Sequence, residues 1–373
     1  MKMRVLLDPQ AFLMQRYGGV SRYVTEMYQL FLNNETIEVK CPMVYSENLH
    51  LSEKKLAPRF FSFLYKISFK GKAKLLHYTL DKWTQKKVLN EIKRQHFDIF
   101  FATFFNTYFL KGLEQKPYVI TIYDMINELF PQYFKDVEKI IERKLLLMQQ
   151  ATRIIAISQN TKDDILRLYP FIDGGKIDVV HLYHSITPDY TTVKDLPGNY
   201  ILFVGGRQGY KNFQFFVEAV AAILKNDKTL FLVCAGGGAF TAAEKELLVA
   251  SEISDRVIQR NFSDGELGSY YKNARLFVFP SEYEGFGIPV LEAMYCGCPV
   301  VLPHHSSFPE VAGDAGIFFE LNDKEDLVNK ISLILNNELL RNEYIEKGRM
   351  QEKKFSWVNT ANGCLKTMQS AVN

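Results

Sequence analysis

Short apolar runs alternate along the chain with longer stretches in which apolar residues recur every three or four positions. The run from Met3 to Leu7 has the length of a buried strand, and the stretch from Ser21 to Leu32 has the period of an amphipathic helix. Strands that alternate with helices in this way predict a parallel sheet with helices on both faces. The pattern therefore predicts an α/β fold made of doubly wound layers.

The strands expected from this pattern fall into two groups of six. The first group covers residues 3–7, 39–44, 99–102, 118–122, 153–157 and 176–180, and the second covers 200–204, 229–235, 257–259, 276–279, 299–302 and 316–319. Helices are expected between them, for example at 21–32, 133–150 and 211–226. Each half of the chain thus has the elements of one doubly wound domain.

Two domains also follow from the length, because 373 residues exceed what one ordinary hydrophobic core organises. A segment with two prolines and no apolar period marks the linker. We expect a first domain over 1–187, a linker over 188–198, a second domain over 199–354 and a last helix over 355–373.

Composition favours a globular protein of the cytoplasm. The chain is 47% hydrophobic and 23% charged, and no run approaches the roughly 20 apolar residues that a bilayer-spanning helix needs. The start has only a short apolar run, which reads as a first strand and not as a leader. The five cysteines are odd in number and scattered, which fits a reducing compartment.

One basic stretch stands out, from Lys54 to Arg94. It holds 12 Lys and Arg against 2 acids, a net +10, so the rest of a chain of net charge +3 carries −7. Aromatic residues are interspersed with these cations, a mixture that suits an anionic membrane surface. The alternative is a solvated helix pair whose aromatic rings face the core. No nucleic-acid motif accompanies the stretch, so we expect no nucleic acid as a partner.

The segment EGFGIPVLE, from Glu284 to Glu292, points to a ligand site. Its Gly285-Phe286-Gly287 turn precedes Pro289, which favours the first turn of a helix. Glu284 is therefore expected in a loop and Glu292 one turn inside the helix. Exposed amides at a helix N-terminus bind phosphate, and carboxylates accept hydrogen bonds from hydroxyls. Together they suit a nucleotide sugar.

A second segment, ILFVGGRQGYKN from Ile201 to Asn212, supports the same ligand. An apolar strand ends in Gly205-Gly206, where a phosphate can approach the backbone. Arg207 offers a planar fork of donors and Lys211 a point charge, which together suit a diphosphate. Taken alone, the segment could also be a strand followed by a turn with two solvated cations.

The two segments resemble the donor site of the family 4 retaining glycosyltransferases, which have the GT-B fold of two facing Rossmann-like domains. Further segments look like the family's in the family's order, namely YGGVSRY (17–23), TIYDMI (121–126), AISQNTKDDI (156–165) and SSFPEVAGDAGI (306–317). The resemblance covers nearly the whole chain. It implies a C-terminal helix that crosses back onto the first domain, and its N-terminal segments are most like those of mannosyltransferases.

The resemblance also implies roles for the donor-site residues. Arg207 and Lys211 would clamp the donor diphosphate, Glu292 would bind the ribose hydroxyls and Glu284 would contact the transferred sugar. The base is expected near Phe262. Further donor contacts are expected from the strand-end glycine and the turn that opens the helix, namely Gly206, Gly285, Phe286, Gly287 and Ile288.

The acceptor is expected on the first domain. Gly18 and Gly19 would approach it closely, with Arg22 beside them. Asp124 follows an expected strand and would orient the acceptor as part of the catalytic set with Glu284, Arg207 and Lys211. The family often has a His-Asp pair here, whereas this chain has Tyr123-Asp124. An imidazole can carry a proton near neutral pH, whereas a phenol cannot readily do so. Tyr123 would therefore serve only as a hydrogen-bond donor.

The reaction implied is transfer of a hexose, GDP-mannose being the first donor expected, to a saccharide or lipid-linked acceptor in surface-polysaccharide or lipopolysaccharide synthesis. The sequence has no Asp-x-Asp, so neither a metal nor another cofactor is expected. Alternatives are a GT-B sugar-nucleotide epimerase, or an inactive homologue that binds nucleotide sugar or acts as a membrane scaffold. An enzyme at the inner face of the membrane is the leading interpretation.

Overall fold

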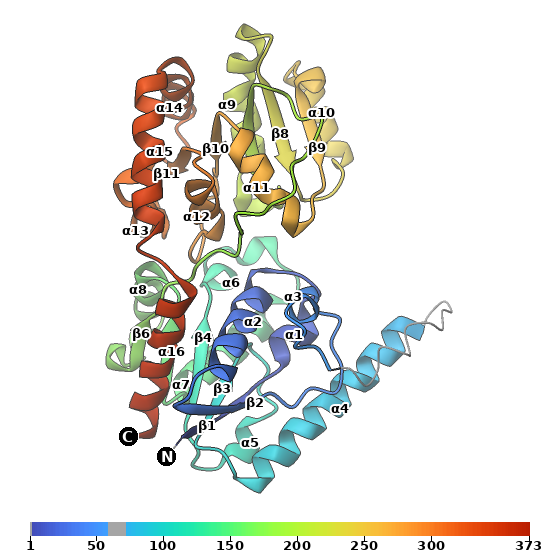
Figure 1. Ribbon diagram of the computed structural model, residues 1–373, viewed down its shortest axis with the longest axis vertical. Helices are drawn as coiled ribbons and strands as arrows, with labels where there is room; N and C mark the ends of the chain where they lie inside the picture. Colours follow the sequence, from blue (N-terminus) through green and yellow to red (C-terminus); the bar gives the residue numbers. More distant parts are fainter. Residues whose placement is uncertain (1, 59–71) are drawn as a thin grey trace. The chain divides into compact units, whose positions relative to one another are not determined.

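The computed structural model describes residues 2–58 and 72–373, which form two compact units (Figure 1). The first unit contains the chain up to Glu128, then Phe134–Leu182, and finally Trp357–Asn373. The second contains Leu129–Tyr133 and Tyr183–Ser356. Each unit is built around one sheet.

The sheet of the first unit has six strands in the order β2-β1-β3-β4-β5-β6. Every neighbouring pair is parallel. The strands are β1 (Met3–Leu7), β2 (Ile37–Lys40), β3 (Ile99–Ala102), β4 (Tyr118–Ile122), β5 (Arg153–Ala156) and β6 (Ile177–Val179).

The sheet of the second unit also has six parallel strands, in the order β12-β11-β10-β7-β8-β9. They are β7 (Tyr200–Val204), β8 (Phe231–Ala235), β9 (Val257–Arg260), β10 (Leu276–Val278), β11 (Val300–Pro303) and β12 (Gly316–Phe319). The central strand β7 reads YILFV and is buried throughout, as expected for a parallel strand covered on both faces.

Helices connect the strands of both sheets. In the first unit they are α1 (Gln10–Met14), α2 (Gly19–Leu32), α3 (Leu49–Glu53), α4 (Lys72–Arg94), α5 (Leu110–Leu113), α6 (Ile126–Leu129, its last residue in the second unit), α7 (Val137–Gln150), α8 (Gln159–Leu168) and α16 (Trp357–Val372). In the second they are α9 (Phe213–Asn226), α10 (Ala242–Ala250), α11 (Asp264–Asn273), α12 (Ile288–Tyr295), α13 (Phe308–Ala312), α14 (Lys324–Asn336) and α15 (Glu338–Glu352).

The expected strands are all present, and one is displaced. The run 39–44 was expected to be a strand, but β2 covers Ile37–Lys40 and ends before Pro42. Proline has no amide hydrogen to donate to a ladder, so the segment after Lys40 does not continue the sheet. The α/β class and the two doubly wound sheets are confirmed.

Two expected domain boundaries are corrected. The first domain was expected to end at residue 187, but Tyr183 and later residues belong to the second unit. There Tyr183 donates to Glu352, and Nε2 of His184 lies 3.1 Å from Oε1 of the same carboxylate. The last helix starts at Trp357 and not at 355, and Phe355 belongs to the second unit, where it packs on Phe286.

The C-terminal helix α16 returns to the first unit, as expected. It packs against α2, β4 and β5. The hydroxyl of Tyr23 in α2 lies 3.3 Å from Sγ of Cys364, and the rings of Tyr23 and Trp357 are 6.4 Å apart. The first unit is therefore completed by residues from both ends of the chain. Among the helices described, none has the length and apolar content to cross a membrane.

Candidate functional site

The turn before α12 has the geometry that EGFGIPVLE predicts. Glu284 lies in the loop after β10, Gly287 caps α12 with φ +94°, and Pro289 stands in its first turn. A φ of this sign is in the left-handed region, which glycine enters at no steric cost. Gly285 and Ile288 are half-buried, whereas Phe286 and Gly287 are buried. The N-terminus of α12 therefore follows a turn of fixed shape.

Two serines that the sequence did not single out for this task hold the turn. Oγ of Ser306 donates to the carbonyl oxygen of Glu284 at 2.7 Å and accepts from its amide at 3.1 Å. Oγ of the buried Ser307 lies 2.9 Å from both the Glu284 and the Phe286 carbonyl oxygens. The SSFPEV segment thus caps the turn. A loop with two serines was the available signal, but their partners lie more than 20 residues away.

Lys211 and Glu284 meet in the second unit, 73 positions apart in sequence. Nζ of Lys211 lies 2.5 Å from Oε1 of Glu284, and both side chains are largely buried. Burial lowers the pKa of Lys211, but the nearby Glu284 and Tyr210 outweigh it, so that the pKa is raised above its usual value. The lysine is therefore cationic at neutral pH, and the structure brings together two residues that the sequence placed at the donor.

Glu292 lies on α12 and is only 6% exposed. Its Oε2 accepts a hydrogen bond of 3.1 Å from the hydroxyl of Tyr271 in α11. Burial raises the pKa of Tyr271 well above its usual value, so the hydroxyl keeps the proton that it donates. Tyr271 thus orients the carboxylate, a role that its sequence position did not indicate.

Arg207, expected at the donor diphosphate, is buried and hydrogen-bonded to protein groups in this structure. Its guanidinium donates to the Gly236 oxygen at 3.0 Å and to the Gly238 oxygen at 2.9 Å. Nε donates to Oε1 of Glu244 in α10 at 2.8 Å. The side chain is 2% exposed. In this structure Arg207 therefore braces the loop after β8.

That loop depends on three consecutive glycines. Gly236, Gly237 and Gly238 all have positive φ, from +71° to +82°. A Cβ on Gly237 would lie 2.5 Å from the carbonyl oxygen of Gly205, closer than real Cβ atoms approach. The loop after β8 therefore packs directly on the loop after β7.

Open backbone lies beside this contact. Gly205 has φ +102°, and a Cβ on Gly205 or Gly206 would have no described atom within 4 Å. Phe262 follows β9, and its ring lies 3.1 Å from the position of a Cβ on Gly236. These residues, like Glu284, follow the carboxyl ends of strands β7 to β10, where ligands of doubly wound sheets bind. The structure thus gathers Gly206, Lys211, Phe262 and Glu284 at one edge of the second sheet.

The residues expected at the acceptor lie in the first unit. Gly18 caps α2, Gly19 is its first residue, and Arg22 is 9% exposed with Nη2 3.2 Å from the Tyr17 hydroxyl. Asp124 follows β4 and is half-buried; its Oδ1 accepts from the amide of Ile126 at 3.1 Å.

The Tyr123 side chain is buried and hydrogen-bonded within the first unit. It is 6% exposed, and its hydroxyl donates to the backbone oxygen of Thr103 at 2.9 Å. In this structure its proton is therefore used inside the first unit. Tyr123 here serves to join β4 to the loop after β3.

A buried acid that sequence reasoning missed lies close by. Asp8 directly follows β1 and is fully buried; it accepts hydrogen bonds from the Tyr108 hydroxyl at 2.8 Å and from Nε2 of Gln10 at 2.6 Å. Burial raises the pKa of Asp8 to about 7, although these hydrogen bonds act in the opposite direction. Its position after a strand was the available signal.

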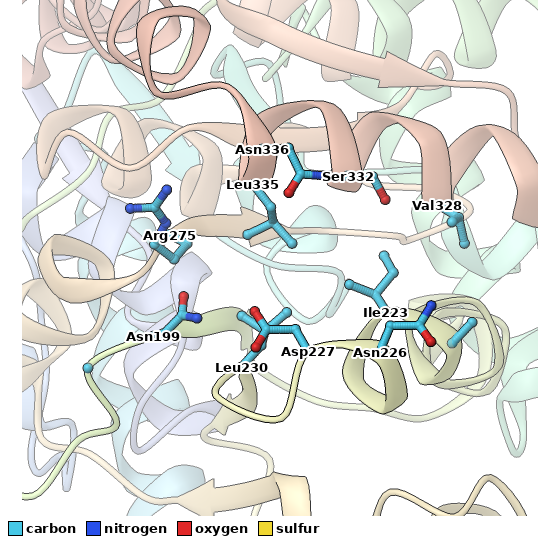
Figure 2. A pocket seen from close by; sticks show the side chains of 12 residues that line it. Asn199, Ile223, Asn226, Asp227, Leu230, Arg275, Val328, Ser332, Leu335 and Asn336 are labelled. Atoms are coloured by element: carbon cyan, nitrogen blue, oxygen red, sulfur yellow. The ribbon is translucent and has the colours of Figure 1, made fainter.

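Two other features carry no ligand assignment. A pocket of about 610 Å³ between α9 and α14 is lined by Asn199, Ile223, Arg275 and Leu335 among others (Figure 2). It opens near the starts of β7, β8 and β10, the opposite edge of the sheet from the candidate site.

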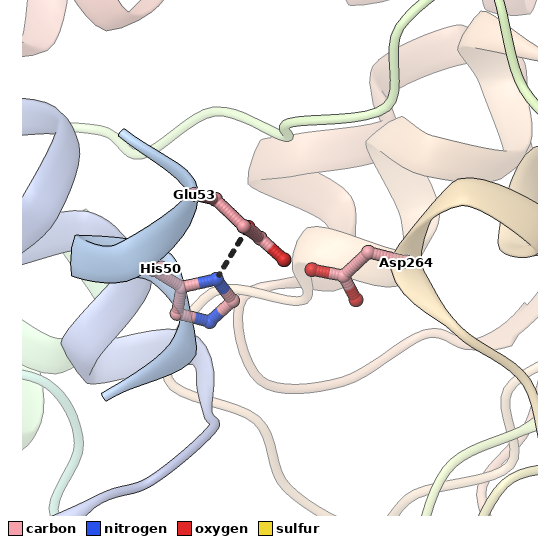
Figure 3. Close-up of side chains that lie close together, drawn as sticks. All are labelled: His50, Glu53 and Asp264. Carbon is pink, nitrogen blue, oxygen red and sulfur yellow. Dashed lines mark ion pairs between the residues drawn. The ribbon is translucent and has the colours of Figure 1, made fainter. Parts of the chain in front are cut away.

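The second feature is a group of three side chains. His50 and Glu53 of α3 form an ion pair of 3.7 Å (Figure 3). Asp264, drawn with them, belongs to the other unit, so we assign no metal site to the three.

Two family models match the chain. "Glycosyltransferase Family 4" covers residues 17–182, and "Glycosyl transferases group 1" covers residues 191–351. The chain belongs to the family 4 glycosyltransferases. In this glycosyltransferase the first family model matches the unit that contains Asp124. The second family model matches the unit that contains Lys211, Glu284 and Glu292.

Named relatives of this glycosyltransferase include enzymes of O-antigen synthesis. It is 29% identical over 262 residues to the O-antigen chain mannosyltransferase B of Escherichia coli, covering 65% of this chain and 67% of that protein. It is 29% identical over 218 residues to the O-antigen chain mannosyltransferase RfbU of Salmonella typhimurium, 58% of this chain and 60% of that protein. The chain thus spans less than two thirds of RfbU.

Solved structures share the fold. HepE from Anabaena, in complex with UDP and glucose, is matched with a TM-score of 0.74 at 15% identity over 99% of this chain and 100% of that one. Sucrose-phosphate synthase from Thermosynechococcus elongatus is matched with a TM-score of 0.70 at 18% identity over 98% of each chain. The glycosyltransferase therefore has the GT-B fold.

Proposed function

We propose that this glycosyltransferase moves a hexose from a nucleotide sugar to a saccharide or lipid-linked acceptor in surface-polysaccharide or lipopolysaccharide synthesis. Mannose from GDP-mannose is the first donor proposed. The printed names of the O-antigen mannosyltransferases support mannose, and the UDP bound to HepE makes UDP-sugars the first competitors.

One observation carries the proposal: Nζ of Lys211 contacts Glu284 at the start of the turn that leads into α12. A leaving diphosphate gains negative charge, and a lysine beside a helix N-terminus stabilises that charge. In the structure, Glu284 neutralises the lysine. When a donor binds, Nζ would contact the diphosphate while Glu284 contacts the transferred sugar.

The further details of the reaction are proposed from the family. The product would keep the anomeric configuration of the donor. The diphosphate would be neutralised by Lys211 and the amides from Gly285 to Ile288, without a divalent ion or other cofactor. Glu292, held by Tyr271, would accept hydrogen bonds from the ribose hydroxyls. Arg207 would contribute by shaping the loop after β8.

A panel of GDP, UDP and their sugar conjugates, each with and without EDTA, tests this function by thermal shift. A ligand at 100 times its dissociation constant stabilises the folded protein by about 2.7 kcal/mol. We expect a rise in melting temperature with one nucleotide family, GDP first, that EDTA leaves unchanged. No rise with any nucleotide would contradict the donor site, and a rise that EDTA removes would contradict metal independence.

We also propose an anionic membrane surface as a partner, through α4. Residues 59–71 of the basic and aromatic stretch lie outside the described residues. In the described part of α4, Leu80, Thr84, Val88 and Ile92 are buried, while Trp83 is 57% exposed. Lys82, Lys86, Lys93 and Arg94 are exposed as well. Figure 1 shows α4 extending away from the first sheet. Each cation near an anionic surface contributes about 1 kcal/mol.

Flotation with lipid vesicles tests this partner. We expect the protein to float with vesicles containing phosphatidylglycerol and not with pure phosphatidylcholine, and to be released by high salt. The variant Lys82→Glu/Lys86→Glu should lose most of the binding, whereas Lys228→Glu, an exposed lysine of the second unit, should keep it. Equal binding by the two variants would contradict the proposed surface.

A further inference from the structure

Lys144 in α7 is completely buried, with a side-chain exposure of 0%. A lysine is almost never fully buried unless it is paired. Its Nζ lies 2.8 Å from Oε2 of Glu128 and 3.2 Å from the backbone oxygen of Asp124. It also lies 5.2 Å from the ring centre of Phe105. All of these groups belong to the first unit.

These contacts join both ends of one turn. The turn runs from Asp124, directly after β4, to Glu128 in α6. Lys144 binds the main chain at its start and a carboxylate at its end. Within the turn, the Asp124 side chain also accepts from the Ile126 amide. The ammonium group of Lys144 therefore fixes the backbone that carries the Asp124 carboxylate.

Stability alone does not account for this arrangement. Replacing a buried ion pair by apolar residues of similar volume is often neutral or stabilising, because two charges have been taken out of water. The Glu128 side chain is 4% exposed, and its Oε1 has no hydrogen-bond partner among the described residues. Burial raises the pKa of Glu128, although Lys144 opposes that shift. The pair thus carries a cost that an apolar pair would avoid.

We propose that Lys144 is a positioning residue for acceptor use. It acts through the main chain of Asp124, which it holds at the carboxyl end of β4 so that the Asp124 carboxylate meets the acceptor hydroxyl. This inference rests on the proposed function, because it assigns Asp124 to the acceptor. Lys144 itself touches neither donor nor acceptor in this account.

The test compares the double variant Lys144→Met/Glu128→Leu with the single variant Lys144→Met. The single variant leaves a buried carboxylate unpaired and should melt at a lower temperature, whereas the double variant should regain most of that loss. Arg153→Met/Asp178→Leu is the matched control, because this ion pair joins β5 to β6 in the same unit.

We expect the double variant to bind nucleotide as the wild type does but to lose about tenfold or more in kcat/KM for the acceptor, as small displacements of a reacting group do. On an Asp124→Asn background the same double change should cost little more, because both act through one carboxylate. A double variant with the wild-type melting temperature and wild-type kcat/KM would overturn the proposal.

Hydrogen exchange separates this inference from the proposed function. Backbone amides from 124 to 128 should exchange faster in the double variant and not in the control. Unchanged exchange in this turn would overturn the positioning role whatever the reaction is. Faster exchange in a wild-type-like fold, with no transfer by the wild type from any nucleotide sugar, would instead refute the proposed function.

Discussion

Single residues account for most of what the sequence could and could not reveal about the site. The EGFGIPVLE segment predicted the places of Glu284 and Glu292 because proline and glycine fix a turn and a helix start locally. The partners of Arg207 could not be predicted. Apart from the Glu244 carboxylate, they are carbonyl oxygens from Gly236 to Ala239, and a backbone oxygen has no sequence signature.

Lys211→Met should weaken binding of the nucleoside diphosphate by about 10- to 100-fold, because one charged hydrogen bond contributes about 1.5–3 kcal/mol. Isothermal titration with GDP and UDP measures the change. Lys225→Met is the matched control, since Lys225 pairs with Glu252 on the exposed surface of the same unit. Equal affinities in the two variants would contradict the diphosphate contact.

Asp8 should make stability depend on pH. Its pKa is about 7 in the folded protein and about 4 in an unfolded chain. The folded protein therefore holds the Asp8 proton more tightly than the unfolded chain does, and this stabilises the fold. The stabilisation is fully present below pH 4 and is lost as the pH rises through 7. The free energy of unfolding should fall by up to about 4 kcal/mol across that range. Urea titrations of wild type and Asp8→Asn at pH 5 and pH 8 measure it; an equal fall in both would show that Asp8 is not responsible.

At the scale of elements, the pattern of apolar runs was sufficient for the strands, because buried parallel strands are short and almost wholly apolar. The end of β2 was missed, since Val39 to Val44 reads as apolar and only Pro42 stops the ladder. The loop after β8 was underestimated as well. Its three glycines bring that loop against Gly205, a contact between two strand ends that the pattern of apolar runs does not indicate.

Gly237→Ala should destabilise the second unit more than Gly238→Ala does. Both positions have positive φ, which costs about 1–3 kcal/mol for a residue with a side chain. Only at Gly237 would the added methyl also meet a backbone oxygen at 2.5 Å; at Gly238 no described atom lies within 4 Å. Thermal unfolding of the two variants measures the difference. Equal losses would show that the close approach of the two loops is not required.

At the scale of the whole molecule, each unit has its own sheet and its own part of the proposed chemistry. The two-domain organisation followed from length and from the linker composition. The exact boundary did not, because it depends on Tyr183 and His184 bonding to Glu352, almost 170 positions away. A linear pattern does not reveal a partner so distant.

Nucleotide binding should therefore protect the second unit selectively. With saturating GDP or UDP, hydrogen exchange should slow in 203–212, 236–239 and 284–292, which hold Lys211, the glycine loop and both glutamates. The pocket between α9 and α14 serves as an internal control and should not change. Protection centred on that pocket would move the ligand to the opposite edge of the sheet.

The most direct measurement is transfer of a labelled sugar from a panel of nucleotide sugars to a lipid and saccharide extract, by wild type and by Glu284→Gln. The wild type should label the acceptor fraction from one donor, GDP-mannose first. Glu284→Gln should bind nucleotide within a few-fold of wild type but transfer about 100-fold more slowly or less, because it loses a contact made in the transition state. A Glu284→Gln protein that transfers at the full rate would contradict the donor site proposed for this glycosyltransferase.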